Sequence, residues 1–346
     1  MKRMTKKINI LFAFCCLMVL NKLGAQDLHF SQYFNAPLLV NPANTGFNPD
    51  FDYRVGGNYR NQWTTVSNNP YKTMSVWADA QLFNNRFEDA WVGVGGALLQ
   101  DVAGSGNLKS TKGFASIAYH QLLGFKSLLS GGFNVGFTQK SIDINKFTFN
   151  SQWNGKFFDV TVPSNEPFQY SSVSYFTLQA GINYAYFASD NLYLNAGISM
   201  SNINRPRESF FAQTNANDAR LDVRYTYFAN ASVKVNDLWI LSPNIYYSQM
   251  ASSTELVMGM IVQRDLSGEH NGSLQFLAGG YFRKNDAAIP MVGFDIKNVK
   301  FTFNYDVTYS TMKQYNQTRG AYEVSIVKNG LYGSGEKNIK CPTVKF

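Results

Sequence analysis

Residues 301–310 read Phe-Thr-Phe-Asn-Tyr-Asp-Val-Thr-Tyr-Ser, so apolar and polar side chains alternate along this stretch. Successive side chains of a β-strand point to opposite faces, and the stretch therefore predicts a strand with one apolar and one polar face. The same alternation recurs in residues 51–60, 128–139 and 173–187. The polar faces carry mostly Gly, Ser, Thr, Asn and Gln, whereas the polar face of a soluble sheet is rich in Lys, Glu and Asp. Such strands suit a wall between two different environments.

Similar alternating segments fill most of the chain, and no amphipathic helix interrupts them. Most have 10–13 residues, close to the ~9–11 that a tilted strand needs to cross a bilayer. We expect an all-β fold, a transmembrane antiparallel up-and-down β-barrel of about 14 strands with an apolar exterior and a polar interior. The predicted strands are residues 51–60, 71–83, 90–101, 110–121, 128–139, 173–187, 191–201, 223–235, 239–250, 254–265, 273–284, 286–297, 300–310 and 320–329.

The composition excludes several other classes of protein. Of the 346 residues, 45% are hydrophobic and 16% are charged, whereas about a quarter of the residues of a typical soluble domain are charged. The apolar content excludes disorder, and no run of ~18 apolar residues predicts a membrane-spanning helix. A secreted β-sandwich or a propeller is the alternative to a barrel, and the chain lacks the ~40–50-residue repeat of a propeller.

The N-terminus has the pattern of an export signal. Basic residues precede an apolar run from Ile10 to Leu20, and Ala25 offers a small residue for cleavage. We therefore expect residues 1–25 to be a cleaved signal peptide, with Gln26 as the first mature residue and the outer membrane as the destination. Cleavage removes five basic residues and lowers the formal charge from +8 to +3 (8 − 5). No basic patch then remains to favour nucleic acid as a partner.

Residues 26–50 precede the first predicted strand and contain Pro37, Pro42 and Pro49. Two interpretations stand equal: a plug or periplasmic cap, and a mere leader into the first strand. Strand glycines would leave room for a segment inside the lumen; these are Gly56, Gly57, Gly131, Gly132 and Gly136. An even number of strands in residues 51–330 places both termini in the periplasm, including a tail at residues 331–346.

Two long connections, residues 140–170 and 202–222, exceed the ~12–15 residues above which loops are usually functional or disordered. Aromatic side chains supply large, rigid contact areas, which favours a role in binding a partner protein. In the other interpretation these aromatics only close the mouth of the barrel. The candidate partner-contact residues are Trp153, Phe157, Arg205, Arg207 and Phe210.

No motif for catalysis is present. The three histidines, His29, His120 and His270, lack metal-site spacing, and the single mature cysteine, Cys341, has no paired ligand. Asp295 and Asp306 are the carboxylates that could pair on the lumen wall, and charged residues there more often tune the interior than catalyse. We expect a protein that is not an enzyme and that binds no cofactor or metal.

The mature N-terminus carries a family signature. Residues 26–46 read Gln-Asp-Leu-His-Phe-Ser-Gln-Tyr-Phe-Asn-Ala-Pro-Leu-Leu-Val-Asn-Pro-Ala-Asn-Thr-Gly, and residues 59–63 read Tyr-Arg-Asn-Gln-Trp, with Pro70 after them. Residues 204–210 (Asn-Arg-Pro-Arg-Glu-Ser-Phe) and 340–342 (Lys-Cys-Pro) continue the match, with Phe346 at the end. The chain resembles the PorP/SprF family of the type IX secretion system of Bacteroidota, apart from the order Asn35-Ala36-Pro37 and the spacing between Pro342 and Phe346.

This resemblance implies an integral outer-membrane barrel that serves protein secretion or gliding motility. The implied partners are periplasmic ring and motor proteins of the secretion system, outer-membrane lipid, and secreted cargo, such as adhesins, with a C-terminal sorting domain. The cargo would be exported or held on the cell surface with the help of the barrel. The alternative function is a passive porin or a transporter of small hydrophobic molecules.

Overall fold

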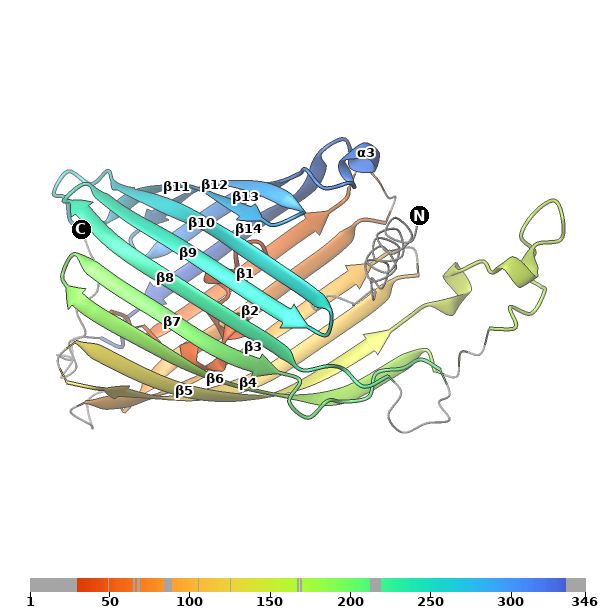
Figure 1. Cartoon of the computed structure of the whole chain (residues 1–346), viewed down its shortest axis with the longest axis horizontal. Coiled ribbons are helices and arrows are strands. Elements are labelled where there is room, and N and C mark those ends of the chain that lie inside the picture. The colour runs from red at the N-terminus through yellow and green to blue at the C-terminus, as the bar shows by residue number, and fades with distance from the viewer. Residues whose placement is uncertain are drawn as a thin grey trace, which may run out of the picture.

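The protein is a closed barrel of fourteen antiparallel strands (Figure 1). The computed structural model describes residues 30–48, 50–64, 66, 69–83, 89–104, 106–124, 126–166, 168, 170–211 and 219–333. The predicted signal peptide and the tail from Ser334 onward lie outside these residues. The strands are β1 (Tyr53–Gln62), β2 (Tyr71–Leu82), β3 (Ala90–Ala103), β4 (Leu108–Leu122), β5 (Ser127–Ser141), β6 (Ser172–Ser189), β7 (Leu192–Ser201), β8 (Arg224–Asn236), β9 (Trp239–Met250), β10 (Ser253–Asp265), β11 (Leu274–Arg283), β12 (Ala287–Ile296), β13 (Val299–Thr308) and β14 (Arg319–Gly330).

The predicted fold class is confirmed, and no strand end differs from its predicted position by more than two residues. Along β13, Phe301 and Phe303 are exposed, whereas Thr302, Asn304 and Asp306 are buried inside the barrel. This apolar-out, polar-in alternation is that of a barrel whose wall faces lipid. Among the described residues, no helix is long and apolar enough to cross a membrane.

Each strand pairs with its neighbours in sequence, and β1 pairs with β14 from Tyr53↔Gly330 to Gln62↔Ala321 to close the sheet. The connections that follow odd-numbered strands therefore lie at one end, which we call the long-loop end. It carries residues 142–171 between β5 and β6, residues 202–223 between β7 and β8, and helix α3 (Lys313–Asn316) between β13 and β14. The opposite, short-loop end holds the start of β1 and the end of β14.

Residues 30–48, which we call the plug, lie inside the barrel. They form the 3₁₀ helix η1 (Tyr33–Asn35), the short helix α2 (Pro37–Val40) and the 3₁₀ helix η2 (Pro42–Asn44). Ser31 hydrogen-bonds to Asp306 and Glu323 near the long-loop end, and Phe47 packs with Trp91 and Phe187 near the short-loop end. Residues 30–48 therefore contact the inner wall near both ends of the barrel.

The expectation that both termini lie in the periplasm concerns residues outside the described part of the chain. The two ends of the strand system, Tyr53 and Gly330, do share one end of the barrel, as predicted from the even strand number. The plug crosses the lumen before β1 begins, however, so Ser31 lies near the opposite end from Gly330. The alternation of the strands gives no information about this extra crossing.

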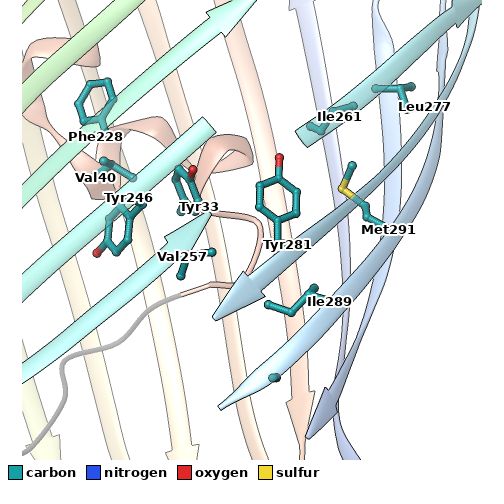
Figure 2. Packing of buried hydrophobic residues seen from close by; sticks show 11 residues of the cluster. Tyr33, Val40, Phe228, Tyr246, Val257, Ile261, Leu277, Tyr281, Ile289 and Met291 are labelled. Carbon is teal, nitrogen blue, oxygen red and sulfur yellow. The ribbon is translucent and has the colours of Figure 1, made fainter. Parts of the chain in front are cut away.

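The plug is held partly by an apolar contact with one side of the barrel interior. Tyr33 and Val40 pack against inward-facing side chains of β8 to β12, and Figure 2 shows Tyr33 between Tyr246 and Tyr281. The ring centroids of Tyr33 and Tyr246 are 4.9 Å apart, and Phe34 stacks on Tyr281 at 5.2 Å. Aromatic pairs at such distances add to the stabilisation from burial. This side of the lumen is therefore a packed core.

Candidate functional site

The two long connections meet at the long-loop end. The β5–β6 connection, which we call the arm (residues 142–166, 168 and 170–171), extends beyond the barrel in Figure 1, where it is yellow-green. At its base the backbone N–H of Tyr170 donates to the carbonyl of Phe210 at 3.1 Å, and the rings of Phe168 and Phe211 stack at 4.8 Å. The β7–β8 connection thus supports the arm from the side.

The structure places all five predicted contact residues on these two connections. Phe210 lies at the base of the arm, and Arg205 forms a 3.0 Å ion pair with Asp222 within the β7–β8 connection. The backbones of Arg207 and Arg220 pair in an isolated antiparallel β-bridge. Trp153 and Phe157 belong to the arm. The five residues therefore form two groups, one on the arm and one beside its base.

The arm presents apolar side chains to the surroundings. Trp153 is 50% exposed and Phe157 is 58% exposed. The ring of Trp153 contacts Phe158, 5.0 Å away in the same arm, and their backbones pair. Hydrogen bonds from the Thr161 hydroxyl (2.6 Å) and backbone N–H (3.0 Å) fix the next turn and lower the pKa of the Asp159 carboxyl below its usual value. Exposed aromatic rings on a supported arm are suited to protein contact.

A cavity of about 1010 Å³ lies inside the barrel at the long-loop end, and we call it the vestibule. Aromatic rings and charges of both signs share its wall. Glu208, from the β7–β8 connection, accepts a hydrogen bond from Lys140 at 2.7 Å and another from the Tyr175 hydroxyl. Further lining residues include Trp63, Tyr71, Asp101, Lys112, Arg60 and Arg283.

A buried ion network forms the floor of the vestibule and holds the plug. Arg60 lies between two carboxylates, 2.9 Å from Asp306 and 3.3 Å from Glu323, and all three side chains are at most 3% exposed. Glu323 accepts hydrogen bonds from the backbone N–H groups of Ser31 and Gln32, both at 2.9 Å. A carboxylate with two backbone donors and an arginine is well satisfied. The network therefore fixes the start of the plug to β1, β13 and β14.

Asp295 and Asp306, the two carboxylates expected to pair on the lumen wall, do not meet. Asp295 lies near the short-loop end of β12, where its register partner is Lys300. The partners of Asp306 are Arg60 and, at 3.2 Å, Arg283. Arg283 also lies 3.3 Å from Glu255. Alternation assigns a residue to a face of the wall, but it does not give its height along the barrel axis relative to distant strands.

Glycines of the barrel wall make room for the rest of the plug. A Cβ at Gly93 would lie 1.9 Å from the Thr45 carbonyl oxygen, and one at Gly132 would lie 2.4 Å from the Ala43 nitrogen. A Cβ at Gly181 would lie 2.1 Å from Asn41 Oδ1. Of the five glycines named from the sequence, Gly132 contacts the plug, while a Cβ at Gly131 would meet nothing within 4 Å. Gly93 and Gly181 were missed, and the only local signal was a small residue on a polar face.

Hydrogen bonds complete the attachment of the plug at the short-loop end. His120 Nε2 lies 2.8 Å from the Thr45 carbonyl oxygen, and Trp91 Nε1 donates to the carbonyl of Gly46 at 3.0 Å. The Gly46 N–H donates to Asp79, which is paired with Arg54. Within the described residues, no three His, Cys, Asp or Glu side chains lie close enough together to hold a metal ion.

A closed barrel with an apolar outer face, polar lumen and long connections at one end defines an integral outer-membrane β-barrel protein. The sequence profile described as "Type IX secretion system membrane protein PorP/SprF" matches residues 22–327. The chain therefore belongs to the PorP/SprF family. A search among curated proteins found no significant match.

Solved structures of other proteins are similar to this chain at low sequence identity. The Pseudomonas putida toluene transporter TodX is 13% identical, with a TM-score of 0.50 over 85% of this chain and 92% of that chain. A Pseudomonas aeruginosa FadL homologue is 8% identical, with a TM-score of 0.49 over 85% and 94%. The translocator domain of the Neisseria meningitidis autotransporter NalP is 12% identical, with a TM-score of 0.44 over 86% and 94%.

Proposed function

We propose that this barrel supports the export or surface anchoring of cargo proteins, such as adhesins of the gliding machinery, as a non-enzymatic part of the type IX secretion system. Family membership supports the link to that system. The observation that carries the role is the plug inside the lumen, which is bonded to the wall at both ends and packed against it in the middle. A barrel filled in this way acts through its surfaces, and it contacts periplasmic ring or motor proteins and cargo with a C-terminal sorting domain.

Of the two expected alternatives, a passive porin fits the lumen less well than the proposed role. A porin needs a water-filled passage through the barrel. Here the plug lies in that passage from Ser31 to Phe47, and it makes polar and apolar contacts with the wall. The vestibule is a cavity above the network of Arg60, Asp306 and Glu323.

The orientation of the barrel follows from its connections. Outer-membrane barrels have short periplasmic turns and longer extracellular loops. We therefore assign the long-loop end, with the arm and the vestibule, to the cell surface. In this orientation the short-loop end faces the ring and motor proteins, and the arm faces secreted cargo.

Exposed residues at the two ends of the barrel give a test of this orientation. In a Cys341→Ser background, Tyr315→Cys on α3 is expected to react with a membrane-impermeant maleimide on intact cells, because Tyr315 is 73% exposed at the long-loop end. Leu331→Cys, which follows β14 at the short-loop end and is 54% exposed, should react only after the outer membrane is permeabilised. Labelling of Leu331→Cys alone on intact cells would show the reverse orientation.

The proposed role predicts a specific secretion defect. Deletion of the gene should remove one or a few large proteins from the surface and culture medium, as measured by quantitative proteomics. The double variant Trp153→Ala/Phe157→Ala should lower the same proteins at least about tenfold, because exposed aromatics at interfaces often contribute more than 1.4 kcal/mol. Tyr315→Ala is the matched control, since Tyr315 is 73% exposed on α3 at the same end.

Each outcome of this comparison is informative. Loss of all type IX cargo on deletion would identify a component that the whole system requires. Equal defects in the arm variant and the Tyr315 variant would argue against the arm as the contact surface. An unchanged proteome on deletion would contradict the proposed function and favour the transport alternative, which predicts altered uptake of small solutes.

A further inference from the structure

Two lysines point outward where the barrel wall reaches the long-loop end. Lys72 is the second residue of β2 and Lys109 is the second residue of β4, and both side chains are exposed. Their neighbours Thr73 and Ser110 are buried inside the barrel, so alternation places the lysines on the outer face of the wall. Both lysines are in register with Val102 of β3, one on either side of it. Because neighbouring strands lie about 4.8 Å apart, the two Cα atoms are about 10 Å apart, and both flexible side chains can reach one group between them.

The outward face of β2, β3 and β4 carries these two positive charges and no carboxylate. The acidic residues of the three strands are Asp79 and Asp101. Asp79 is buried and bound by Arg54, and Asp101 lines the vestibule, so both lie on the inner face. Neither lysine forms an ion pair with a described residue. This part of the outer wall is therefore complementary to an anion.

The wall changes from charged to apolar within three successive outward positions. Gln100 of β3 and Thr111 of β4 are in register one outward position below the lysines, and both are half-buried. The amide of Gln100 and the hydroxyl of Thr111 can each donate a hydrogen bond. The next outward pair, Val76 and Leu98, is apolar, and the two side chains are 63% and 68% exposed. A lipid has the same order of polarity, from its headgroup to its acyl chains.

Aromatic side chains occupy the same register row on the neighbouring strands. Tyr305 of β13 is in register with Tyr322 of β14, Tyr322 with Asn61 of β1, and Asn61 with Lys72. Aromatic girdles of outer-membrane barrels lie where the wall meets the membrane surface. The row therefore runs at the membrane interface, which places Lys72 and Lys109 among lipid headgroups.

We propose that Lys72 and Lys109 together bind a phosphate of a membrane lipid. Lysines bind phosphate as point charges, and charge-assisted hydrogen bonds to phosphate are strong. Gln100 and Thr111 donate hydrogen bonds to the headgroup, and the acyl chains extend over the apolar wall below. The phosphate belongs to a lipid because the site faces the membrane and continues into a surface that only acyl chains would cover. In the orientation assigned above, the lipid is lipid A of the cell-surface leaflet. The inference does not depend on the proposed role in secretion.

Lipid A with and without its phosphates tests the proposal. Full-length protein purified in detergent is mixed with lipid A or with the same lipid A stripped of its phosphates, and bound lipid is counted by native mass spectrometry. The wild type should bind the phosphorylated form about thirtyfold more tightly, the value for two lysines beside an anionic lipid. Lys72→Gln/Lys109→Gln should bind both forms equally. Val102→Glu, which keeps the lysines and adds a carboxylate between them, should also lose the preference.

Lys156→Gln/Lys313→Gln is the matched control, because it removes the same charge from two exposed lysines on the arm and on α3. It should bind like the wild type, and heat-modifiable migration on gels identifies the folded variants. If the double lysine variant does not fold, Val102→Glu decides. No preference in the wild type, a preference kept by the folded double variant, or an equal loss in the control would overturn the proposal. Displacement of lipid A by equimolar inorganic phosphate would overturn the lipid as the ligand and show a site for free phosphate.

Discussion

Replacement of Arg60 by leucine is expected to destabilise the barrel by about 3–5 kcal/mol, the usual effect of removing one partner from a buried ion pair. Arg60 lies between Asp306 and Glu323, and all three side chains are nearly inaccessible to solvent. Without Arg60, Glu323 keeps only the N–H donors of Ser31 and Gln32. The free energy of unfolding can be measured by urea titration of the purified protein in lipid vesicles.

The control for this prediction is an exposed ion pair at the same end of the barrel. Arg205 and Asp222 lie 3.0 Å apart, and their side chains are 55% and 47% exposed. Arg205→Leu should therefore change the unfolding free energy by less than about 1 kcal/mol. Arg60→Lys keeps one positive charge but cannot contact both carboxylates with a planar fork, so it should fall between the two. Similar small effects for Arg60→Leu and Arg205→Leu would contradict the buried network.

The second large effect concerns the plug. Gly93→Leu combined with Gly132→Leu is expected to convert a closed barrel into a conducting pore. A side chain at either position would occupy space now filled by backbone atoms of Thr45, or of Pro42 and Ala43. Overpacking at a tight contact costs about 1–3 kcal/mol per site, and the plug is the part that can leave. Single-channel recordings in planar bilayers should show sustained conductance that the wild type lacks.

Gly131→Leu is the matched control, because a Cβ at this adjacent position would meet nothing within 4 Å. It should remain closed. If the double variant forms a heat-modifiable barrel and still does not conduct, the plug is not what seals the lumen. Secretion measured in the same strains then separates two roles of the plug: a closed, secretion-defective variant would point to a partner contact, and an open, secretion-competent one to a simple seal.

The variants of the lumen and the variants of the arm test different parts of the protein. The Arg60 and glycine variants test how the lumen is filled. The arm variants test which surface meets cargo, and the outcome for Trp153 and Phe157 is independent of conductance. A strain with a sealed lumen and an altered arm that loses its cargo would support a role through surfaces.

The strands can be predicted from the amino-acid sequence alone. Alternation is a local property. The residues Phe301, Thr302 and Phe303 indicate the two faces of β13, and this inference needs no information about the rest of the chain. Strand number, strand length and the low charge of the polar faces then predicted a membrane barrel, and the motif at residues 26–46 indicated the family. The long connections were also evident, because neither shows a sustained period of two.

The segment inside the barrel and the contacts between polar residues become evident in the folded structure. Asn35 donates to Ser325, 290 residues away, and Asn41 donates to the Ile182 carbonyl, 141 residues away. Such partners depend on how the strands are staggered around a closed sheet, and alternation fixes the face of a residue but not its height. For the same reason Arg60 could be placed on a polar face, while its position between Asp306 and Glu323 could not.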